Sequence, residues 1–344
     1  MARRGFASDN ASGVHPRVLE AIAAANDGHA LGYGNDAWTA AATTAVQQAF
    51  DCAAEVLFCF GGTGANVIAL AAATRRHEAV LCADCAHIWN DECAAPERFL
   101  SGKLIPVAAT QGKLTPAALG PWTEAGRGVH RTPPRVLSLT QPTEWGTLYT
   151  PAELRALTEF AHAQGWVVHV DGARFANAAA ALDLSLAELA PGCGIDVLSF
   201  GGTKNGLLGA EAVVFFDPAL GADAAYARKQ ATQLASKMRF LAAQFSAYLA
   251  DDLWRELAGH ANAMARRLAD RLDGLPGVEL TCPVEVNMLF PRLPQAALVA
   301  LAARFDFHVW DASRGIARLL TSFDTSAADV DAFAEAVREA LAAG

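Results

Sequence analysis

The sequence predicts an α/β fold, with a large domain built on a mainly parallel sheet and a smaller α+β domain at the C-terminal end. Short apolar runs alternate with helical patterns through the first two-thirds of the 344 residues. This alternation is typical of a parallel sheet covered by helices on both faces. Beyond about residue 218 the pattern changes. We expect a large domain with the N-terminal segment over residues 1–240, and a small C-terminal domain with its linking helix over residues 241–344.

Short apolar runs predict the strands of the large domain. The first, Glu55–Phe60, is followed by a helical pattern over Gly64–Thr74. The clearest helix is Pro151–Gln164, because Thr150 suits the N-cap and proline suits the first helical position. The further strand candidates are Ala79–Cys82, Leu104–Val107, Arg135–Thr140, Val167–Val170, Asp196–Phe200 and Ala212–Phe216.

The last third of the chain shows a different order of elements. Residues 218–272 are predicted to be almost continuously helical, with no convincing strand. Shorter elements follow the glycines at 274 and 277, and together they indicate a small α+β domain. The predicted strands are Val286–Pro291, Phe307–Trp310 and Ala317–Ser322, and the predicted helices are Gln295–Ala303 and Ala327–Ala343.

Composition excludes several classes of protein. A hydrophobic fraction of 53% with 18% charged residues is typical of a globular chain. The formal net charge is −9 and no basic block is present, so we expect no nucleic-acid partner. Apolar stretches are too short for a membrane span, and Met1–Asn10 lacks the apolar core of a secretory signal. The seven scattered cysteines predict reduced thiols in the cytoplasm, and a lone C-x-x-C pair predicts no metal site.

Lys204 is the first candidate for chemistry. It lies in Phe200–Gly206, just past an apolar strand and among glycines that allow close approach to the backbone. A desolvated lysine has a lowered pKa and can act as a nucleophile or form a Schiff base. Taken alone, a lysine in such a segment is far more often a surface residue of a loop.

Asp171 strengthens this interpretation. It ends the apolar strand Val167–Val170, and the carboxyl ends of parallel strands are where α/β proteins bind ligands. An aspartate that pairs with a protonated pyridine nitrogen, together with a Schiff-base lysine, makes pyridoxal 5'-phosphate (PLP) an electron sink. The alternative role for Asp171 is that of a helix N-cap.

Two further segments could complete such a site. Phe60–Asn66 is a strand end followed by a glycine-rich turn and a helix start, which suits a phosphate group. The turn lacks the spacing of dinucleotide and nucleotide-triphosphate motifs. His87 follows the next strand candidate and could stack on a pyridine ring or transfer a proton, and His130 could approach the same crevice. A purely structural role for His87 stays open.

At this point the chain resembles the low-specificity L-threonine aldolases, which belong to the β-eliminating lyase group of fold type I PLP enzymes. The resemblance runs in order across nearly the whole length and is weaker in the last third. H-x-D-G-A-R followed by G-T-K-N-G is its most specific part. The matching stretches are F-A-S-D-N near the start, Gly32–Asp36, Gly61–Asn66, Ala86–Glu92, His169–Phe175, Ser199–Gly206 and Ser236–Phe240.

The resemblance implies a fold like that of aspartate aminotransferase and a role for each matching residue. Lys204 would hold PLP as a Schiff base, Asp171 would pair with the ring nitrogen, and His87 would stack on the ring. Arg239 would help to bind the phosphate of a neighbouring subunit in a homodimer or homotetramer, with either Lys229 or Lys237 assisting. Gly62 and Thr63 would bind the phosphate, and Ser8, Arg174 and Arg318 would hold the substrate carboxylate.

The implied activity is retro-aldol cleavage of L-threonine, L-allo-threonine and related β-hydroxy-α-amino acids to glycine and an aldehyde. Clamping the carboxylate would select the Cα–Cβ bond, and His87, His130 or a water molecule would take the β-hydroxyl proton. Other PLP reactions on the same fold are alternatives, namely β-elimination, transamination or a preference for phenylserine. A non-catalytic scaffold with a fossil site and a metal hydrolase using His87 and His169 are alternatives from other classes.

Overall fold

A seven-stranded sheet forms the centre of the first two-thirds of the chain in the computed structural model, which describes residues 5–123 and 128–343. Its strand order is β1-β7-β6-β5-β4-β2-β3. All neighbouring strands are parallel except β7, which runs antiparallel to both β1 and β6. The strands are β1 Glu55–Cys59, β2 Ala79–Ala83, β3 Lys103–Val107, β4 Pro134–Thr140, β5 Val167–Gly172, β6 Val197–Gly201 and β7 Glu211–Phe215.

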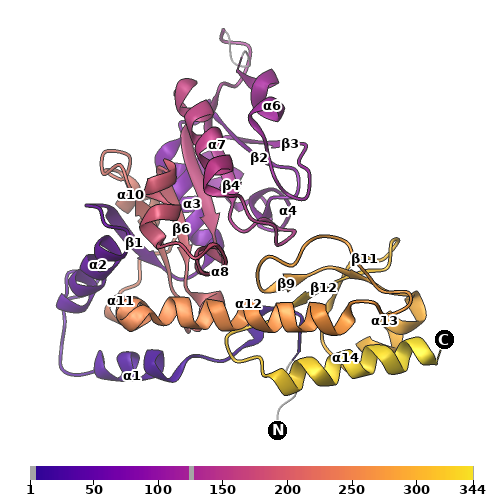
Figure 1. Ribbon diagram of the computed structural model, residues 1–344. Coiled ribbons are helices and arrows are strands. Elements are labelled where there is room, and N and C mark those ends of the chain that lie inside the picture. Colours follow the sequence, from indigo (N-terminus) through magenta and orange to yellow (C-terminus); the bar gives the residue numbers. More distant parts are fainter. Residues whose placement is uncertain (1–4, 124–127, 344) are drawn as a thin grey trace.

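Helices cover both faces of this sheet (Figure 1). The layer of α3, α5 and α10 packs on one face, and α7 and α8 contact the sheet on the other. The shortest helices, α4, α6 and α9, cover His87–Asn90, Pro116–Leu119 and Leu186–Leu189. The others are α1 Pro16–Ala24, α2 Ala37–Ala49, α3 Gly62–Ala73, α5 Ala95–Leu100, α7 Pro151–Ala163, α8 Phe175–Leu182, α10 Ala224–Gln230, α11 Arg239–Leu249, α12 Leu253–Leu272, α13 Gln295–Ala302 and α14 Ala327–Ala342.

A second, antiparallel sheet lies in the last third of the chain. Its strands are ordered β11-β12-β10-β8, with β9 paired to β12. Helices α12, α13 and α14 complete a separate hydrophobic cluster with this sheet. The strands are β8 Glu279–Leu280, β9 Met288–Leu289, β10 Pro291–Arg292, β11 His308–Asp311 and β12 Ile316–Leu320.

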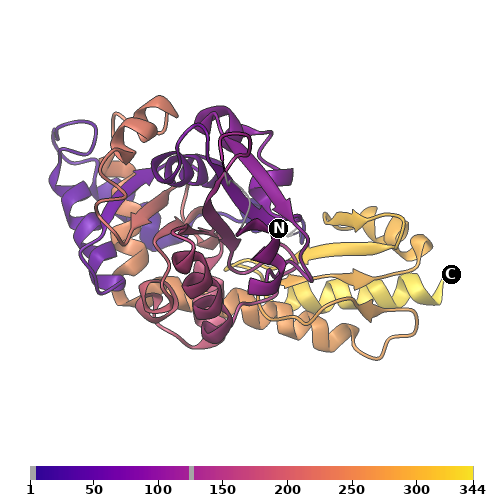
Figure 2. The same cartoon turned by 90° about the horizontal axis from the view of Figure 1, so that it is seen from above.

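The two parts lie side by side and are joined by both a helix and the N-terminal segment (Figure 2). The long helix α12 runs from beneath the large sheet to α14 (Figure 1). Phe6 is buried in the C-terminal cluster, and its carbonyl oxygen accepts a hydrogen bond of 2.8 Å from the N–H of Leu320. Strand β12 therefore contacts the N-terminal segment.

The predicted α/β fold with a smaller α+β part is confirmed, and the seven predicted strands match β1–β7 closely. The capping box of α7 at Thr150 and Glu153 confirms the predicted helix start. The expectation of continuous helix over residues 218–272 is wrong in part: left-handed backbone at Thr232, Asp251 and Asp252 accompanies the breaks between α10, α11 and α12. Helix α11 spans residue 240, so a domain boundary there stays a prediction.

The C-terminal strand Val286–Pro291 is divided into β9 and β10, and β8 was not predicted. Helices α13 and α14 agree with their predicted ranges to within one residue. In the described part of the chain, no helix combines the length and the apolar character needed to cross a membrane.

Candidate active site

A narrow cavity opens at the carboxyl ends of β4, β5 and β6, where open α/β sheets bind ligands. The space that no atom fills, including the open mouth, is about 410 Å³. Loops from several strands contribute to its walls. Among the lining residues are Gly62, Thr63, Asn66, His87, Glu92, Glu144, Asp171, Arg174 and Lys204.

Asp171 lies near the carboxyl end of β5 and lines this cavity, and both of its carboxylate oxygens accept hydrogen bonds. Its Oδ2 accepts a hydrogen bond of 2.9 Å from Nδ2 of Asn66, and its Oδ1 accepts one of 3.1 Å from the N–H of Ala173. Burial alone would raise the pKa of Asp171, but His87, Lys204 and Asn66 outweigh it and hold the pKa below its usual value. The carboxyl group is therefore an anion in the folded protein.

His87 and Glu92 form the wall beside Asp171. Nδ1 of His87 lies 2.9 Å from Oε1 of Glu92, and the same oxygen accepts a hydrogen bond of 2.8 Å from Nδ2 of Asn66. The hydrogen bond to Glu92 is the main reason why the pKa of His87 is raised. Glu92 therefore orients the imidazole and favours its protonated form.

His169 has no free nitrogen for a ligand. It lies in β5 two residues before Asp171, between the hydroxyl groups of Ser138 at 2.9 Å and Ser199 at 3.0 Å. Burial lowers its pKa to about 4, so the ring is neutral. This arrangement gives the metal hydrolase alternative no support from His169.

Lys204 lies in a short 3-10 turn, Thr203–Asn205, directly after β6. A side chain at Gly201 would clash with the carbonyl oxygen of Ala173, so glycine is needed where β6 passes the end of β5. The turn is anchored by Asn205, whose Nδ2 donates to the hydroxyl of Tyr248 at 2.7 Å. The positive charge of Lys204 is one of several influences on four buried or partly buried carboxyl groups, and in each case it favours the ionised form. These groups are Asp9, Glu144, Asp171 and Glu211.

The glycine turn presents the start of α3 to the cavity. Gly61 is the N-cap of α3 and has no side chain that could cap the first N–H groups. A Cβ atom at Gly61 or at Gly62 would meet no atom within 4 Å, so the space above the turn is open. Unpaired N–H groups and the positive end of a 12-residue helix suit a phosphate group. The residues present therefore fit the predicted cofactor.

Two arginines lie at the mouth of the site. Nε and Nη2 of Arg174 donate to the two carboxylate oxygens of Asp9 at 2.6 and 2.9 Å. Arg318, on β12, lies over the ring of Trp310, and its buried Nε has no hydrogen-bond partner. Burial first and Arg174 second lower the pKa of Arg318, so the two guanidinium groups are close enough to repel each other. A bound carboxylate would relieve that repulsion.

The structure does not bring every predicted residue to this cavity. His130 lies in a different surface cavity with His77 and Thr132. The guanidinium of Arg239 donates to the carbonyl oxygens of Asp27 and Gly28, and Arg239 is not among the residues that line the cavity. Ser8 caps a short 3-10 turn by accepting from the N–H of Asn10 at 3.1 Å, and it is the neighbouring Asp9 that contacts Arg174.

The two lysines proposed to assist the phosphate also lie outside the cavity of this chain. Nζ of Lys229 lies 5.3 Å from the centroid of the Tyr33 ring, and Lys237 is exposed. Tyr33 and Lys237 belong to adjoining segments, because the N–H of Tyr33 donates to the carbonyl oxygen of Ser236 at 3.0 Å. The two lysines and Arg239 thus gather on one surface.

Sequence reasoning missed four residues of the site. Glu92 and Asp9 lie inside matching motifs, but no role was assigned to them. Asn66 ends the glycine-turn motif, and its burial could have been inferred from the apolar helix that follows. Glu144 belongs to the loop after β4, and its position at a strand end was the only available signal.

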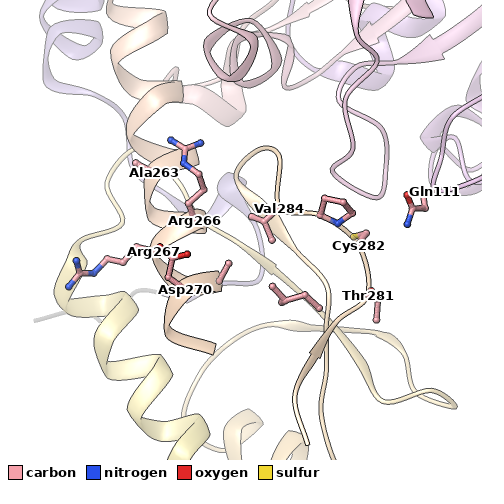
Figure 3. Close-up of a pocket in the computed structure, with 11 residues that line it drawn as sticks. Gln111, Ala263, Arg266, Arg267, Asp270, Thr281, Cys282 and Val284 are labelled. Carbon is pink, nitrogen blue, oxygen red and sulfur yellow. The ribbon is translucent and has the colours of Figure 1, made fainter. Parts of the chain in front are cut away.

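A larger cavity lies elsewhere, between α12 and the segment Leu280–Val284, with Gln111 at its edge (Figure 3). It includes no predicted site residue. Arg267 in its wall is paired with Asp331 at 2.7 Å, and Figure 3 shows Arg267 pointing away from the opposite wall. Size alone therefore does not identify the functional site.

Known proteins are similar to this chain in sequence and in fold. The family model described as beta-eliminating lyase matches residues 5–294. The chain is 46% identical to the low specificity L-threonine aldolase of Pseudomonas aeruginosa and 43% identical to that of a Pseudomonas strain, in each case over 98% of both chains. A threonine aldolase structure from Leishmania major superposes with a TM-score of 0.92 at 32% identity, covering 97% of this chain and 98% of that one.

The broader fold is also found in more distant structures. An aspartate aminotransferase of Rhodobacter sphaeroides superposes with a TM-score of 0.71 at 18% identity, covering 100% of this chain and 94% of that one. At this identity the likeness concerns the fold alone.

Proposed function

The chain belongs to the β-eliminating lyase family, and from this membership we propose that it cleaves L-threonine, L-allo-threonine and related β-hydroxy-α-amino acids to glycine and an aldehyde. Two relatives named low specificity L-threonine aldolase, each matching 98% of the chain, support the reaction. One observation carries the proposal to this molecule: Lys204 and the anionic Asp171 line the same cavity.

PLP is the proposed cofactor. Lys204 would hold it covalently, Asp171 would pair with its ring nitrogen, and His87 would lie against its ring. The N–H groups at Gly62 and Thr63 would bind its phosphate. When bound, PLP supplies a sink for the electron pair that is released when the Cα–Cβ bond breaks. The lowered pKa of Asp171 supports this assignment, because a carboxylate accepts a hydrogen bond from a protonated pyridine nitrogen and stabilises its positive charge.

Arg174 and Arg318 would bind the substrate carboxylate, with the Ser8 segment beside them. Hydrogen bonds to charged groups are each worth about 1.5–3 kcal/mol. Orientation is the more important effect, because the bond that breaks is the one held perpendicular to the cofactor ring. Asp9 fixes Arg174 through two hydrogen bonds and so limits the directions in which the substrate can lie.

A second copy of the chain is the proposed partner. The exposed Tyr226 lies on α10 with Lys229, whose Nζ lies 5.3 Å from the Tyr33 ring. The exposed Leu31 and Tyr33 follow Asp27 and Gly28, whose carbonyl oxygens accept hydrogen bonds from Arg239. This surface would meet a neighbouring subunit in a homodimer or homotetramer, where Arg239 and one of the lysines could reach the other subunit's phosphate. All seven cysteines are free, which agrees with our proposal of a cytoplasmic location.

An absorption spectrum combined with product analysis tests the proposal. The purified protein with added PLP should show a visible band, and threonine should give equal amounts of glycine and acetaldehyde. Lys204→Ala should lose both the band and turnover, whereas the matched control Lys103→Ala, at an exposed strand end, should keep both. Full activity of Lys204→Ala would refute the assignment.

The same assay separates the alternatives. Serine or phenylserine used in place of threonine would reveal a β-eliminating enzyme or a phenylserine-preferring aldolase by the identity of the products. A protein that stays colourless with PLP and inert toward all of these amino acids would instead be the non-catalytic scaffold.

A further inference from the structure

Three carboxylate residues line the cavity, and two of them already have partners. Asp171 accepts hydrogen bonds from Asn66 and Ala173, and Glu92 accepts from Asn66 and contacts His87. No hydrogen bond or ion pair from residues 5–123 or 128–343 engages the side chain of Glu144. Glu144 is therefore the lining carboxylate that is free to accept a proton from a ligand.

The loop that carries Glu144 is tightly held. Gln141 and Tyr149 close its base, because Nε2 of Gln141 donates to the Tyr149 carbonyl at 2.9 Å and the Tyr149 N–H donates to Oε1 of Gln141 at 3.0 Å. Across the loop, the hydroxyl groups of Thr143 and Thr147 are 2.7 Å apart, and Thr147 donates to the carbonyl of Gln111 at 2.8 Å. The backbone around Glu144 is thus fixed before any ligand binds.

The surroundings of Glu144 are those of the reacting part of the substrate. Its electrostatic neighbours include the proposed cofactor residues Asp171, His87 and Lys204. The proposed carboxylate residues Arg174 and Arg318 also interact with it. Burial first and Asp171 second raise the pKa of Glu144, which makes it a better proton acceptor than an exposed glutamate.

We propose that Glu144 is the catalytic base that removes the proton of the substrate β-hydroxyl group. This inference rests on the proposed function. The histidines offered by the sequence are less suited to the role: Nδ1 of His87 is paired with Glu92, and His130 lies in another cavity. Glu144 lines the same cavity as Lys204, Asp171 and Arg174, so its carboxylate would share that space with the bound amino acid.

The proton and electrons balance in this step. The O–H bond of the substrate breaks and its proton passes to the Glu144 carboxylate. The oxygen electrons form the C=O bond of the aldehyde, and the pair of the Cα–Cβ bond stays with Cα. A proton added at Cα then completes glycine, and Glu144 returns its own proton to solvent.

Two reactions of the same enzyme separate this role from the others. Threonine cleavage needs a base at the β-hydroxyl group, whereas exchange of the α-hydrogen of glycine in deuterated water needs only the cofactor, Lys204 and the arginines. In the holoenzyme, Glu144→Gln should lower kcat for threonine by about 10²–10⁴-fold. Its KM and its rate of glycine exchange, followed by NMR, should stay within about threefold of wild type, and Glu144→Asp should retain more cleavage than Glu144→Gln.

Matched controls make the test specific. Oε2 of Glu285 accepts a hydrogen bond of 2.7 Å from the N–H of Leu148 and supports the same loop from outside the cavity. Glu285→Gln should therefore keep threonine cleavage. The PLP dissociation constant of the apoprotein, measured by fluorescence quenching, should change less than about threefold in Glu144→Gln.

The outcomes are distinct. Loss of cleavage alone in Glu144→Gln supports the base. Unchanged cleavage, or an equal loss of cleavage and glycine exchange, overturns it, as does a large loss of PLP affinity. If the wild-type protein itself fails to cleave threonine, the proposed function fails as well, and that result does not depend on any variant of Glu144.

Discussion

Nδ2 of Asn66 lies 2.9 Å from Oδ2 of Asp171, although 105 residues separate them in the chain. This hydrogen bond joins the first helix after the glycine turn to the carboxyl end of the central strand β5. The same amide nitrogen also reaches Glu92 at 2.8 Å. One neutral donor thus separates two buried carboxylates whose repulsion would otherwise be large.

Replacing Asn66 with aspartate should damage the site without changing its volume. Three carboxyl groups would then share one buried space, so at least one must take up a proton, and the pKa of Asp171 should rise. We expect the apoprotein to lose about 1–3 kcal/mol of unfolding free energy. The affinity for PLP should also fall at neutral pH. Urea unfolding and PLP titration measure the two effects, with Asn26→Asp, at an exposed position after α1, as the control.

Asp9→Asn should weaken both substrate binding and the fold. Asp9 is fully buried and its ion pair with Arg174 is short, so removal of one partner should cost about 3–5 kcal/mol at pH 7. Without its two acceptors, Arg174 should orient the substrate less well, which raises KM for threonine by about tenfold. Asp251→Asn, which breaks an exposed ion pair with Arg17, should change neither quantity.

The pH dependence of stability gives a second measurement on Asp9. Burial alone would raise its pKa, but Arg174, Lys204 and Asn287 hold the pKa below its usual value. A lowered folded-state pKa stabilises the protein above the unfolded value of about 4 and loses that effect as pH falls through the folded value. Wild type should therefore lose stability below about pH 4 more steeply than Asp9→Asn. Equal slopes in acid would contradict the assignment.

Glu211 should show the opposite trend. Burial raises its pKa to about 7, so its neutral form is favoured in the folded apoprotein. Its contribution to stability is complete below about pH 4 and is lost as pH rises through about 7. Glu211→Gln stays neutral and can still accept from the N–H of Gly202. The unfolding free energy of the variant relative to that of wild type should therefore rise by about 3 kcal/mol between pH 5 and pH 8. A constant difference across this range would argue against a buried ionisation.

Two glycine variants separate folding from cofactor binding. Gly201→Ala places a methyl group against the Ala173 carbonyl, so unfolding free energy should fall by about 1–3 kcal/mol or more. Gly62→Ala meets open space at a helix start and should leave apoprotein stability unchanged or slightly higher. Its methyl group would lie where the phosphate is proposed, so PLP affinity should fall. Stability curves and PLP titrations of both variants check this contrast.

The sequence indicated the fold and the centre of the site because both depend on local patterns. Apolar runs mark buried strands, and Lys204 and Asp171 follow strands that end at the same edge of the sheet. The direction of β7 could have been inferred as well. Only residues 202–210 connect β6 to β7, which is too short for the crossover that parallel neighbours need.

The remaining residues depend on contacts between distant parts of the chain. Asp9 and Asn287 are 278 residues apart, yet Nδ2 of Asn287 donates to Asp9 at 3.1 Å. The position of Glu144 depends on the shape of one loop. His130 lies in the segment just before β4 and lines another cavity. Strand and helix patterns carry no information on such loops.

The hydrogen bonds from Leu320 to Phe6 and from Asn287 to Asp9 set an order for biosynthesis. A ribosome must translate through residues 287–320 before the segment with Ser8 and Asp9 can make all of its contacts. Until then Asp9 lacks the hydrogen bond from Asn287, and the second arginine, Arg318, has not been made. The central sheet can form from residues made earlier, but the pair of arginines that would hold an amino acid is complete only once β12 has been made.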